Sequence, residues 1–196
     1  MTRIFITLGL LLLLIACSNS PQQVKQYYRL TSDSSLNITE NSHTNQLRDS
    51  VIITRPEALS ILGGRPMVAT RDDGSLVQLN HHYWLESPKV LLQDRLQEWA
   101  TRHWQEVLSS GNITATRDRL VTRILAFEKN QNQAHIHLEF TLINGNNDIL
   151  FSKAFNDTVS LSTNSFAAFA QAADQTVSNM LQQLSQVINQ NLKLTP

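Results

Sequence analysis

The stretch from Ala134 to Leu142 alternates apolar and polar residues without interruption. The apolar set is Ala134, Ile136, Leu138, Phe140 and Leu142. Successive side chains of a β-strand point to opposite faces of its sheet, so this period of two predicts a strand with one buried and one polar face. Half-buried strands of this kind are typical of antiparallel sheets. We therefore expect a sheet that is covered on one side only.

Two further strands are expected to flank this one. Val121 to Glu128 has the character of a strand, and Asn130 to Gln133 is expected to turn the chain into the alternating stretch. On the other side, Asn144 to Asp148 consists of residues that favour turns, and it leads into a third strand from Ile149 to Leu161. Together the three segments predict an antiparallel meander.

Two segments have the period of an α-helix. Ser87 followed by Pro88 is typical of a helix start, because a serine hydroxyl can cap free N–H groups and proline has no N–H to leave unpaired. We expect the first helix to run to about Leu108, with an apolar stripe of Leu92, Leu96, Trp99, Ala100, His103 and Val107. The second is expected from Ser165 to about Leu192, with a stripe of Phe166, Phe169, Ala173, Val177, Met180, Leu181, Leu184 and Ile188.

Shorter elements are expected before the first helix. They are strands at Gln26–Leu30 and Val51–Ile53, a helical turn at Glu57–Leu62, and a hairpin of Met67–Thr70 and Leu76–Leu79 around the turn Asp72–Ser75. The order of elements predicts the α+β class: a single domain with a mostly antiparallel β-sheet and two main α-helices packed on one face.

The N-terminus has the pattern of a secretory signal. Arg3 precedes an unbroken apolar run from Leu10 to Ala16, which ends in Leu14-Ile15-Ala16-Cys17. These four residues match the bacterial lipobox, in which the cysteine receives acyl chains such as palmitate and becomes the first residue of the mature protein. We expect a leader at residues 1–16, a lipidated tether at 17–25 with Cys17 as the lipid attachment site, and the folded domain at 26–196.

Other interpretations of this segment are less well supported. A transmembrane helix needs about 20 apolar residues, whereas polar residues resume here at Ser18. Cys17 is the only cysteine, so an intrachain disulfide is excluded. In enterobacterial-type sorting, as the lipobox resemblance implies, an aspartate after the cysteine retains a lipoprotein in the inner membrane. Ser18 therefore favours the outer membrane.

Composition and motifs argue against several classes of function. Lys and Arg number 16 and Asp and Glu also number 16, without a basic run, so nucleic acid is not expected as a partner. The Gly-x-Ser-x-Gly signature, the phosphate loop and the dinucleotide fingerprint are all absent from the sequence. With its one thiol expected to be acylated, the chain has no cysteine nucleophile. We expect neither an enzyme nor a bound cofactor.

Several histidines and tryptophans are candidate site residues. His135, His137 and Glu139 project from one face of a strand and could ligate a metal, but a further ligand and supporting residues are not evident, so we favour a solvated strand face and expect no metal. His81 and His82 are expected in a surface turn, and His103 in the core. The remaining candidates, Trp84, Trp99 and Trp104, could form an aromatic binding surface but are expected in the core.

The chain from about Tyr27 to Leu192 resembles the ABC-type transport auxiliary lipoprotein family. The matching segments are the lipobox at Cys17, Tyr27-Tyr28-Arg29-Leu30, Val51-Ile52-Ile53, Pro56-Glu57-Ala58-Leu59, Met67-Val68-Ala69-Thr70 and Tyr83-Trp84-Leu85-Glu86-Ser87-Pro88. This resemblance implies a non-enzymatic accessory lipoprotein of the outer membrane, lipid-anchored at its periplasmic face. The implied partner is a periplasmic MCE-domain protein that moves lipids between membranes, and the implied assembly includes a homo-oligomer, as in some relatives.

Three other functions remain open at the level of sequence. The first is an envelope lipoprotein that regulates a cell-wall synthesis enzyme. The second is a metal-dependent hydrolase that would use His135, His137 and Glu139. The third is direct lipid binding, in which the sheet and helices part to hold an acyl chain. The sequence does not identify the lipid or the docking surface.

Overall fold

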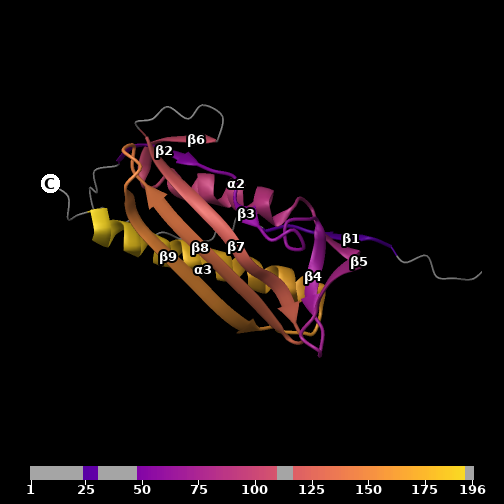
Figure 1. Cartoon of the computed structure of the whole chain (residues 1–196). Helices are drawn as coiled ribbons and strands as arrows, with labels where there is room; N and C mark the ends of the chain where they lie inside the picture. Colours follow the sequence, from indigo (N-terminus) through magenta and orange to yellow (C-terminus); the bar gives the residue numbers. More distant parts are fainter. Residues whose placement is uncertain (1–23, 31–47, 110–116, 193–196) are drawn as a thin grey trace, which may run out of the picture.

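The computed structural model of the protein describes residues 24–30, 48–109 and 117–192. In chain order the elements are β1 (Gln26–Tyr28), β2 (Arg48–Ile53), β3 (Glu57–Ala58), β4 (Pro66–Thr70), β5 (Leu76–Trp84), α2 (Pro88–Ala100), β6 (Trp104–Ser109), β7 (Asp118–Asn130), β8 (Gln133–Ile143), β9 (Ile149–Ser160) and α3 (Phe166–Leu192). The strands form one sheet, and the two described helices cover one of its faces (Figure 1). The expected α+β class is confirmed.

The sheet is organised around β7, which pairs with β2, β3, β4 and β8. Its long pairings, β7 with β8 and β8 with β9, are antiparallel, as is the β4–β5 hairpin. The shorter pairings of β1 with β5, β2 with β6, and β7 with β2, β3 and β4 are parallel. The expected meander and hairpin are both present, and parallel strands extend the sheet on the far side of β7.

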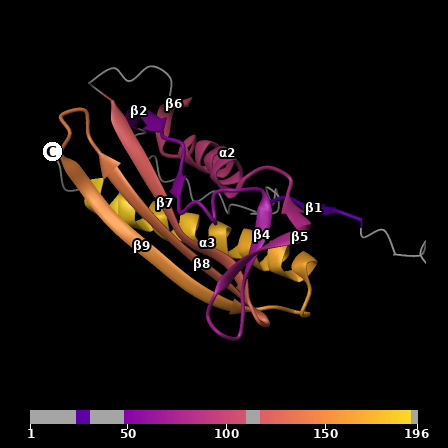
Figure 2. The same cartoon turned by 45° about the vertical axis from the view of Figure 1, so that its right-hand side comes forward.

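The helices lie together on the concave side of the curved sheet (Figure 2). α3 packs against β7, β8 and β9, whereas α2 packs against β2 and β6. On β8, the apolar positions expected in the core, from Ala134 to Leu142, are no more than 1 % exposed. The facing side chains of α3, among them Phe169, Val177 and Met180, are fully buried. One hydrophobic core between sheet and helices therefore stabilises the described domain.

The first helix is shorter than the sequence predicts. α2 ends at Ala100, where the N–H of Thr101 bonds to Gln97, and β6 follows in place of the expected last two turns. Val107 and Leu108 pair with Val51 and Ile52 of β2. The expectation of a helix to Leu108 was wrong because residues spaced three or four apart also fit a turn followed by a strand, and pairing with β2 decides between the two.

Two smaller expectations were also wrong. Glu57 and Ala58 form β3 against β7, and the expected helical turn is confined to the residues after them, where the carbonyl oxygen of Leu59 accepts the N–H groups of Leu62 and Gly63. Ser87 does precede α2, but its side chain makes no capping bond. Its carbonyl oxygen instead accepts the N–H groups of Val90 and Leu91.

The domain is elongated, and its described ends lie far apart. β1 and the first turn of α3 lie at one end, whereas β6, the β8–β9 turn and the last turn of α3 lie at the other (Figures 1 and 2). α3 has 27 residues, which at 1.5 Å per residue gives a length of about 40 Å. Within the described residues, neither helix is apolar enough over a sufficient length to cross a membrane.

Candidate functional site

β1 is the first described element, and it lies at the edge of the sheet beside β5 (Figure 1). The two strands run parallel, with Tyr27 opposite Tyr83 and Tyr28 opposite Trp84. Beyond the strand ends, the N–H of Leu85 donates to the carbonyl oxygen of Tyr28. Because strand residues alternate between faces, β1 presents Tyr27 on one side and Tyr28 on the other.

The outward side of this pairing combines aromatic rings with cations. The Tyr27 and Tyr83 rings lie 5.6 Å apart between centroids. The Lys25 ammonium lies 5.4 Å from the Tyr83 ring, and the Arg65 guanidinium lies 5.4 Å from the Tyr27 ring. Both distances are within the range of cation–π attraction, which holds each cation over an amphipathic ring.

We define the β1 surface as this cluster with the exposed apolar side chains beside it. Its members are Val24, Lys25, Tyr27, Arg65, Tyr83 and Leu85. Val24 is 78 % exposed, Tyr27 50 % and Leu85 43 %, which is high for apolar and aromatic side chains. The β1 surface therefore combines exposed apolar and aromatic area with cations.

The inward side of the same strands is tightly packed. Trp84 is 1 % exposed, and its ring lies 5.4 Å from that of Phe127 and 5.6 Å from that of Phe169. His82 stacks on Phe166 of α3 with 4.2 Å between ring centroids. Burial, with a smaller contribution from the neighbouring His81, lowers the pKa of His82. These contacts pack the strands that carry the β1 surface against the hydrophobic core.

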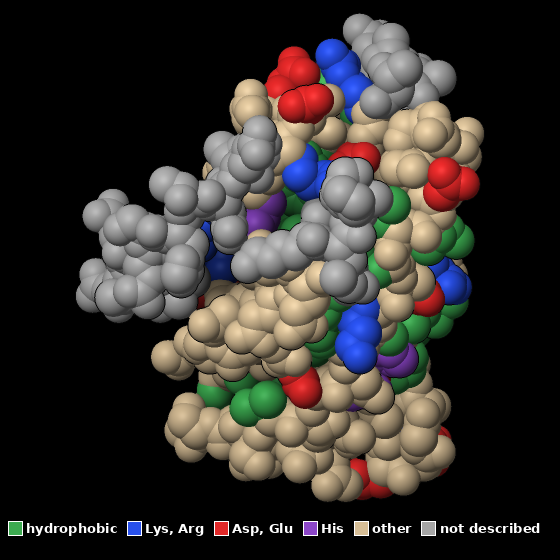
Figure 3. All heavy atoms as spheres, turned by 90° about the vertical axis from the view of Figure 1, so that its left-hand side faces the viewer, with side chains coloured by type: hydrophobic (Ala, Val, Ile, Leu, Met, Phe, Trp, Pro, Cys, Tyr) green, Lys and Arg blue, Asp and Glu red, His purple; other side chains and the backbone are tan. Residues whose placement is uncertain are grey.

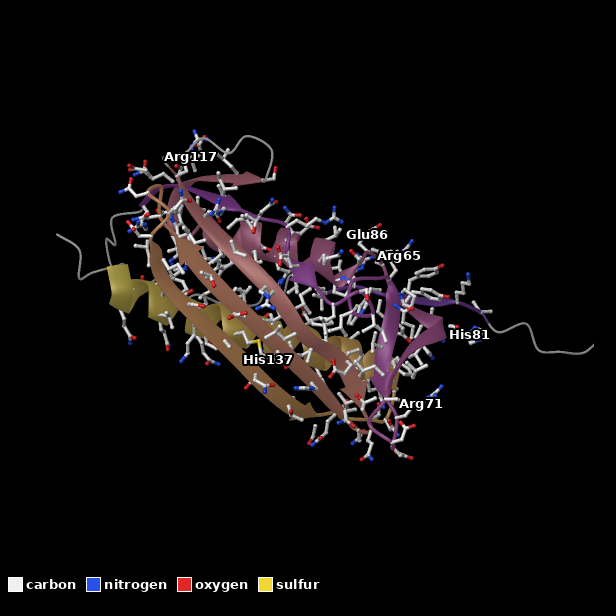
Figure 4. All side chains as sticks on the ribbon, viewed as in Figure 1. Arg65, Arg71, His81, Glu86, Arg117 and His137 are labelled. Carbon is white, nitrogen blue, oxygen red and sulfur yellow. The ribbon has the colours of Figure 1, made fainter. Side chains whose placement is uncertain are left out.

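The candidate metal ligands on β8 are engaged with neighbouring side chains. His135 Nδ1 lies 2.8 Å from Glu128 Oε1, and its Nε2 lies 3.0 Å from Asn156 Oδ1. Glu139 accepts a hydrogen bond of 2.9 Å from Arg123. Figure 4 places His137 on the outer side of the sheet. Across the described ranges, no group of three or more His, Cys, Asp or Glu side chains could hold a metal ion.

His103 lies in the turn between α2 and β6 and contacts α3. Its Nε2 lies 2.9 Å from Ser185 Oγ, which also accepts a bond of 2.8 Å from Trp99 Nε1. Ser185 in turn donates its single hydrogen to the carbonyl of Leu181, so His103 must donate through Nε2 as the neutral tautomer. Burial, and secondarily Arg102, lowers the pKa of His103 to about 4. These contacts fix a helix–helix interface.

The tryptophans do not form a binding surface. Trp84 and Trp104 are 1 % exposed and Trp99 is 4 % exposed, so all three belong to the core, as expected. The expected surface turn at His81 and His82 is instead part of β5. Cys17 and the leader lie outside the described residues, so the lipid attachment site, the tether and their boundaries stay predictions.

Sequence reasoning missed the β1 surface. Tyr27 and Tyr83 are brought together by a parallel pairing between segments more than fifty residues apart, which no local period reveals. The available signal was the aromatic pair Tyr27-Tyr28 within a short strand, with Lys25 two residues earlier. This signal indicates a half-exposed edge strand but does not identify its neighbours.

Comparisons with solved structures support the fold. One crystal structure, of an uncharacterized protein, superimposes with a TM-score of 0.67 at 15 % identity, covering 84 % of this chain and 99 % of the other. A second, of protein XCC0632 from Xanthomonas campestris, gives a TM-score of 0.63 at 15 % identity, covering 89 % and 91 %. At this identity the likeness shows a common fold and nothing finer. A comparison with curated proteins gave no match.

The family comparison covers most of the domain. Residues 28–186 match the family described as ABC-type transport auxiliary lipoprotein component, a range that begins within β1 and ends inside α3. The match therefore includes β2 to β9, the last residue of β1, all of α2 and most of α3. The chain belongs to the family of ABC-type transport auxiliary lipoprotein components.

Proposed function

We propose that the protein is the lipid-anchored accessory subunit of an MCE-type intermembrane lipid transport system. In this role it docks the periplasmic conduit at the outer membrane, contributes to envelope integrity and catalyses no reaction. The family supports the part in transport. The lipobox ending in Cys17 and the residue Ser18 after it support the anchor and the choice of membrane.

The observation that carries this proposal is the separation of the two ends of the domain. β1 directly follows the predicted tether, so the end that bears β1 faces the membrane. The opposite end, with β6, the β8–β9 turn and the last turn of α3, is then presented to the periplasm at a distance of about 40 Å, the length of α3. A rigid spacer with an anchored end and a free end suits a docking subunit.

The free end, which bears β6, is held together by ion pairs between strands and carries both acidic and basic side chains. Arg48 of β2 donates to Asp118 of β7 over 2.7 Å, and Arg117 pairs with Glu106 of β6 at 3.4 Å. Figure 3 views this end directly and shows basic and acidic side chains interspersed over its described part. Ile149, which is 65 % exposed, lies beside the β8–β9 turn. These features favour recognition of a protein partner by shape and by paired charges.

A second surface also favours protein contacts. β9 has 12 residues and pairs only with β8 among the described strands. Its other edge therefore carries backbone N–H and C=O groups that lack a strand partner within the described part of the chain. Such an edge can accept a strand from another protein or from a second copy of this one. We include homo-oligomer formation through this edge in the proposal.

The proposal is tested by moving the anchor without changing the domain. Three forms of the full chain are expressed in cells that lack the native protein: the natural sequence, Cys17→Ala and Ser18→Asp. Cys17→Ala should remain soluble in the periplasm, and Ser18→Asp should be retained in the inner membrane. If the protein docks a conduit at the outer membrane, only the natural sequence restores resistance to detergents that a damaged envelope admits.

The three forms serve as controls for one another. Ser18→Asp keeps the acyl chains and the fold. If it fails to restore detergent resistance, the function requires the outer membrane and not merely acylation. Full restoration by Cys17→Ala would contradict the docking role. Equal restoration by all three forms, with cell-wall synthesis altered in the cells that lack the protein, would favour the regulation of a cell-wall enzyme.

A further inference from the structure

The β1 surface lies where the chain leaves the described domain for its predicted anchor. Six residues separate Cys17 from Val24. Even fully extended, a chain of this length spans at most about 25 Å. Because α3 alone is about 40 Å long, such a tether can bring the end that bears β1 to the membrane but not the opposite end.

The composition of the β1 surface fits the headgroup region of a bilayer. Tyrosine is favoured at membrane–water interfaces because its ring is apolar and its hydroxyl is polar. Tyr27 and Tyr83 present such rings, and the exposed Val24 and Leu85 add apolar area beside them. An exposed apolar group of this kind adjoining an anchor is typical of a surface that rests on lipid.

The cations of the β1 surface complement a layer of anionic lipids. Lys25 and Arg65 lie over the two tyrosine rings, and Arg29, which is also exposed, follows β1 directly. Figure 4 places Arg65 and His81 at this end, together with the acidic Glu86. Each Lys or Arg near an anionic leaflet favours contact by about fivefold.

From these observations we propose that the β1 surface binds the anionic phosphate headgroups of the membrane that holds the anchor. This contact fixes the orientation of the domain, so that its opposite end points away from the membrane. The inference rests on the proposed function, because it requires the acylated Cys17. A protein partner is less well matched to the β1 surface because the short tether already places lipid within reach.

Fluorescent labels on the full-length lipidated protein test this orientation. Because the only native thiol is expected to be acylated, an introduced cysteine provides a single labelling site. Leu85→Cys labels the β1 surface at a position more than sixty residues from the anchor. Ile149→Cys labels the opposite end, at another exposed aliphatic side chain, and is the matched control. Mass spectrometry of the purified protein first verifies acylation, which separates failure of the anchor from failure of the contact.

The labelled proteins are reconstituted into vesicles of phosphatidylethanolamine with phosphatidylglycerol that carry a quencher on the headgroups. We expect the label at position 85 to be quenched several-fold more strongly than the label at 149. In vesicles of phosphatidylcholine alone, or in 0.5 M salt (a Debye length of about 4 Å), the difference should shrink. Equal quenching at the two positions in anionic vesicles would overturn the proposal.

Charge variants provide the second test. Lys25→Gln with Arg65→Gln removes two cations of the β1 surface. The ratio of molecules whose β1 surface contacts lipid to molecules whose β1 surface does not should fall by about 25-fold. Lys153→Gln with Arg102→Gln removes two exposed cations elsewhere and should leave the ratio unchanged. Lys25→Gln alone, which alters only the N-terminal flank of β1, should give an intermediate value.

The same variants distinguish this proposal from the proposed function. If Lys25→Gln with Arg65→Gln releases the β1 surface from lipid while an MCE-domain protein still co-purifies, the contact orients the domain but does not recruit the partner. If the pair abolishes co-purification and leaves quenching at position 85 intact, the β1 surface binds protein rather than lipid, and the proposal is overturned.

Discussion

Arg48 and Asp118 stand 70 residues apart in the chain and meet at 2.7 Å where β2 and β7 begin. The guanidinium of Arg48 in β2 donates to the carboxylate of Asp118 at the start of β7, and the Asp118 side chain is only 10 % exposed. The same carboxylate oxygen accepts from Trp104 Nε1 at 3.3 Å, which adds β6 to the contact. One acidic side chain thus joins three strands at the free end of the domain.

Replacing Asp118 by Ala should destabilise the protein by about 2 kcal/mol, because the buried Trp104 and the half-buried Arg48 lose a charged acceptor. Urea unfolding followed by circular dichroism measures this change. Glu139→Ala is the control, since it removes the partner of Arg123 in an exposed pair, where the expected loss is about 0.5 kcal/mol. Equal losses in the two variants would contradict the organising role of Asp118.

The interface between α2 and α3 predicts a dependence of stability on pH. Burial lowers the pKa of His103 to about 4, below its ordinary value of 6.5. Between these values the unfolded chain binds a proton at this position that the folded protein does not, so the free energy of unfolding falls as the pH falls from 6.5 to 4. His103→Gln should reduce that loss.

Two measurements check this prediction. Nuclear magnetic resonance titration of the imidazole ring should give a pKa well below 6 for His103, and urea unfolding at several pH values should show a shallower loss in His103→Gln. His137→Gln, on the outer face of β8, is the control and should leave the slope unchanged. A His103 ring that titrates at its ordinary value would contradict the assignment.

Ser185→Ala should destabilise the same interface by about 1.5 kcal/mol, because Trp99 and His103 both lose their acceptor on α3. The emission of Trp99 should shift as its indole N–H loses this partner. Ser152→Ala removes the hydroxyl of an exposed serine that bonds to the Thr141 hydroxyl, and it should have little effect on either quantity. A stability loss in Ser152→Ala as large as that in Ser185→Ala would contradict this view of the interface.

Phe169→Ala should cost about 4 kcal/mol, since it leaves a cavity at the contact between α3 and the sheet. Phe169 is fully buried and lies against Trp84. The midpoint of thermal unfolding, with Gln171→Ala on the exposed side of the same helix turn as control, measures the loss. The prediction fails if the two variants unfold at the same temperature.

Local periods in the sequence predicted the meander and α3 correctly. The strand from Ala134 to Leu142 and the stripe from Phe166 to Ile188 each bury a continuous row of side chains, so the period alone identifies the element and its inner face. The hairpin of β4 and β5 was predicted from its turn, where Gly74 has a φ of +82°, a value that glycine adopts without strain.

The parallel part of the sheet could not be predicted in the same way. The segment up to Leu108 was assigned to the first helix because His103 and Val107 continue the apolar stripe, and only its pairing with β2 makes it a strand. The β1 surface likewise depends on the pairing of β1 with β5. Such pairings join distant segments, and the chain between them carries no signal of the register.

The sequence predicted the lipid anchor at Cys17, whereas the β1 surface was found only in the structure. Cys17 was found from a local motif, and its acylation stays a prediction that protein mass spectrometry can test. Lys25, Tyr27 and Arg65 belong to no motif and became a candidate site only when the fold placed them together. The predicted tether between Cys17 and β1 is short, so the proposed anchor would bring the β1 surface to the membrane.

The most direct test of the proposed role is in-cell crosslinking of tagged full-length protein, followed by mass spectrometry of what co-purifies from the membranes. Crosslinkable residues at Ile149 and at Leu85 sample the two ends of the domain. We predict that an MCE-domain protein is recovered through position 149 and not through position 85. Recovery of cell-wall synthases alone, from either position, would contradict it.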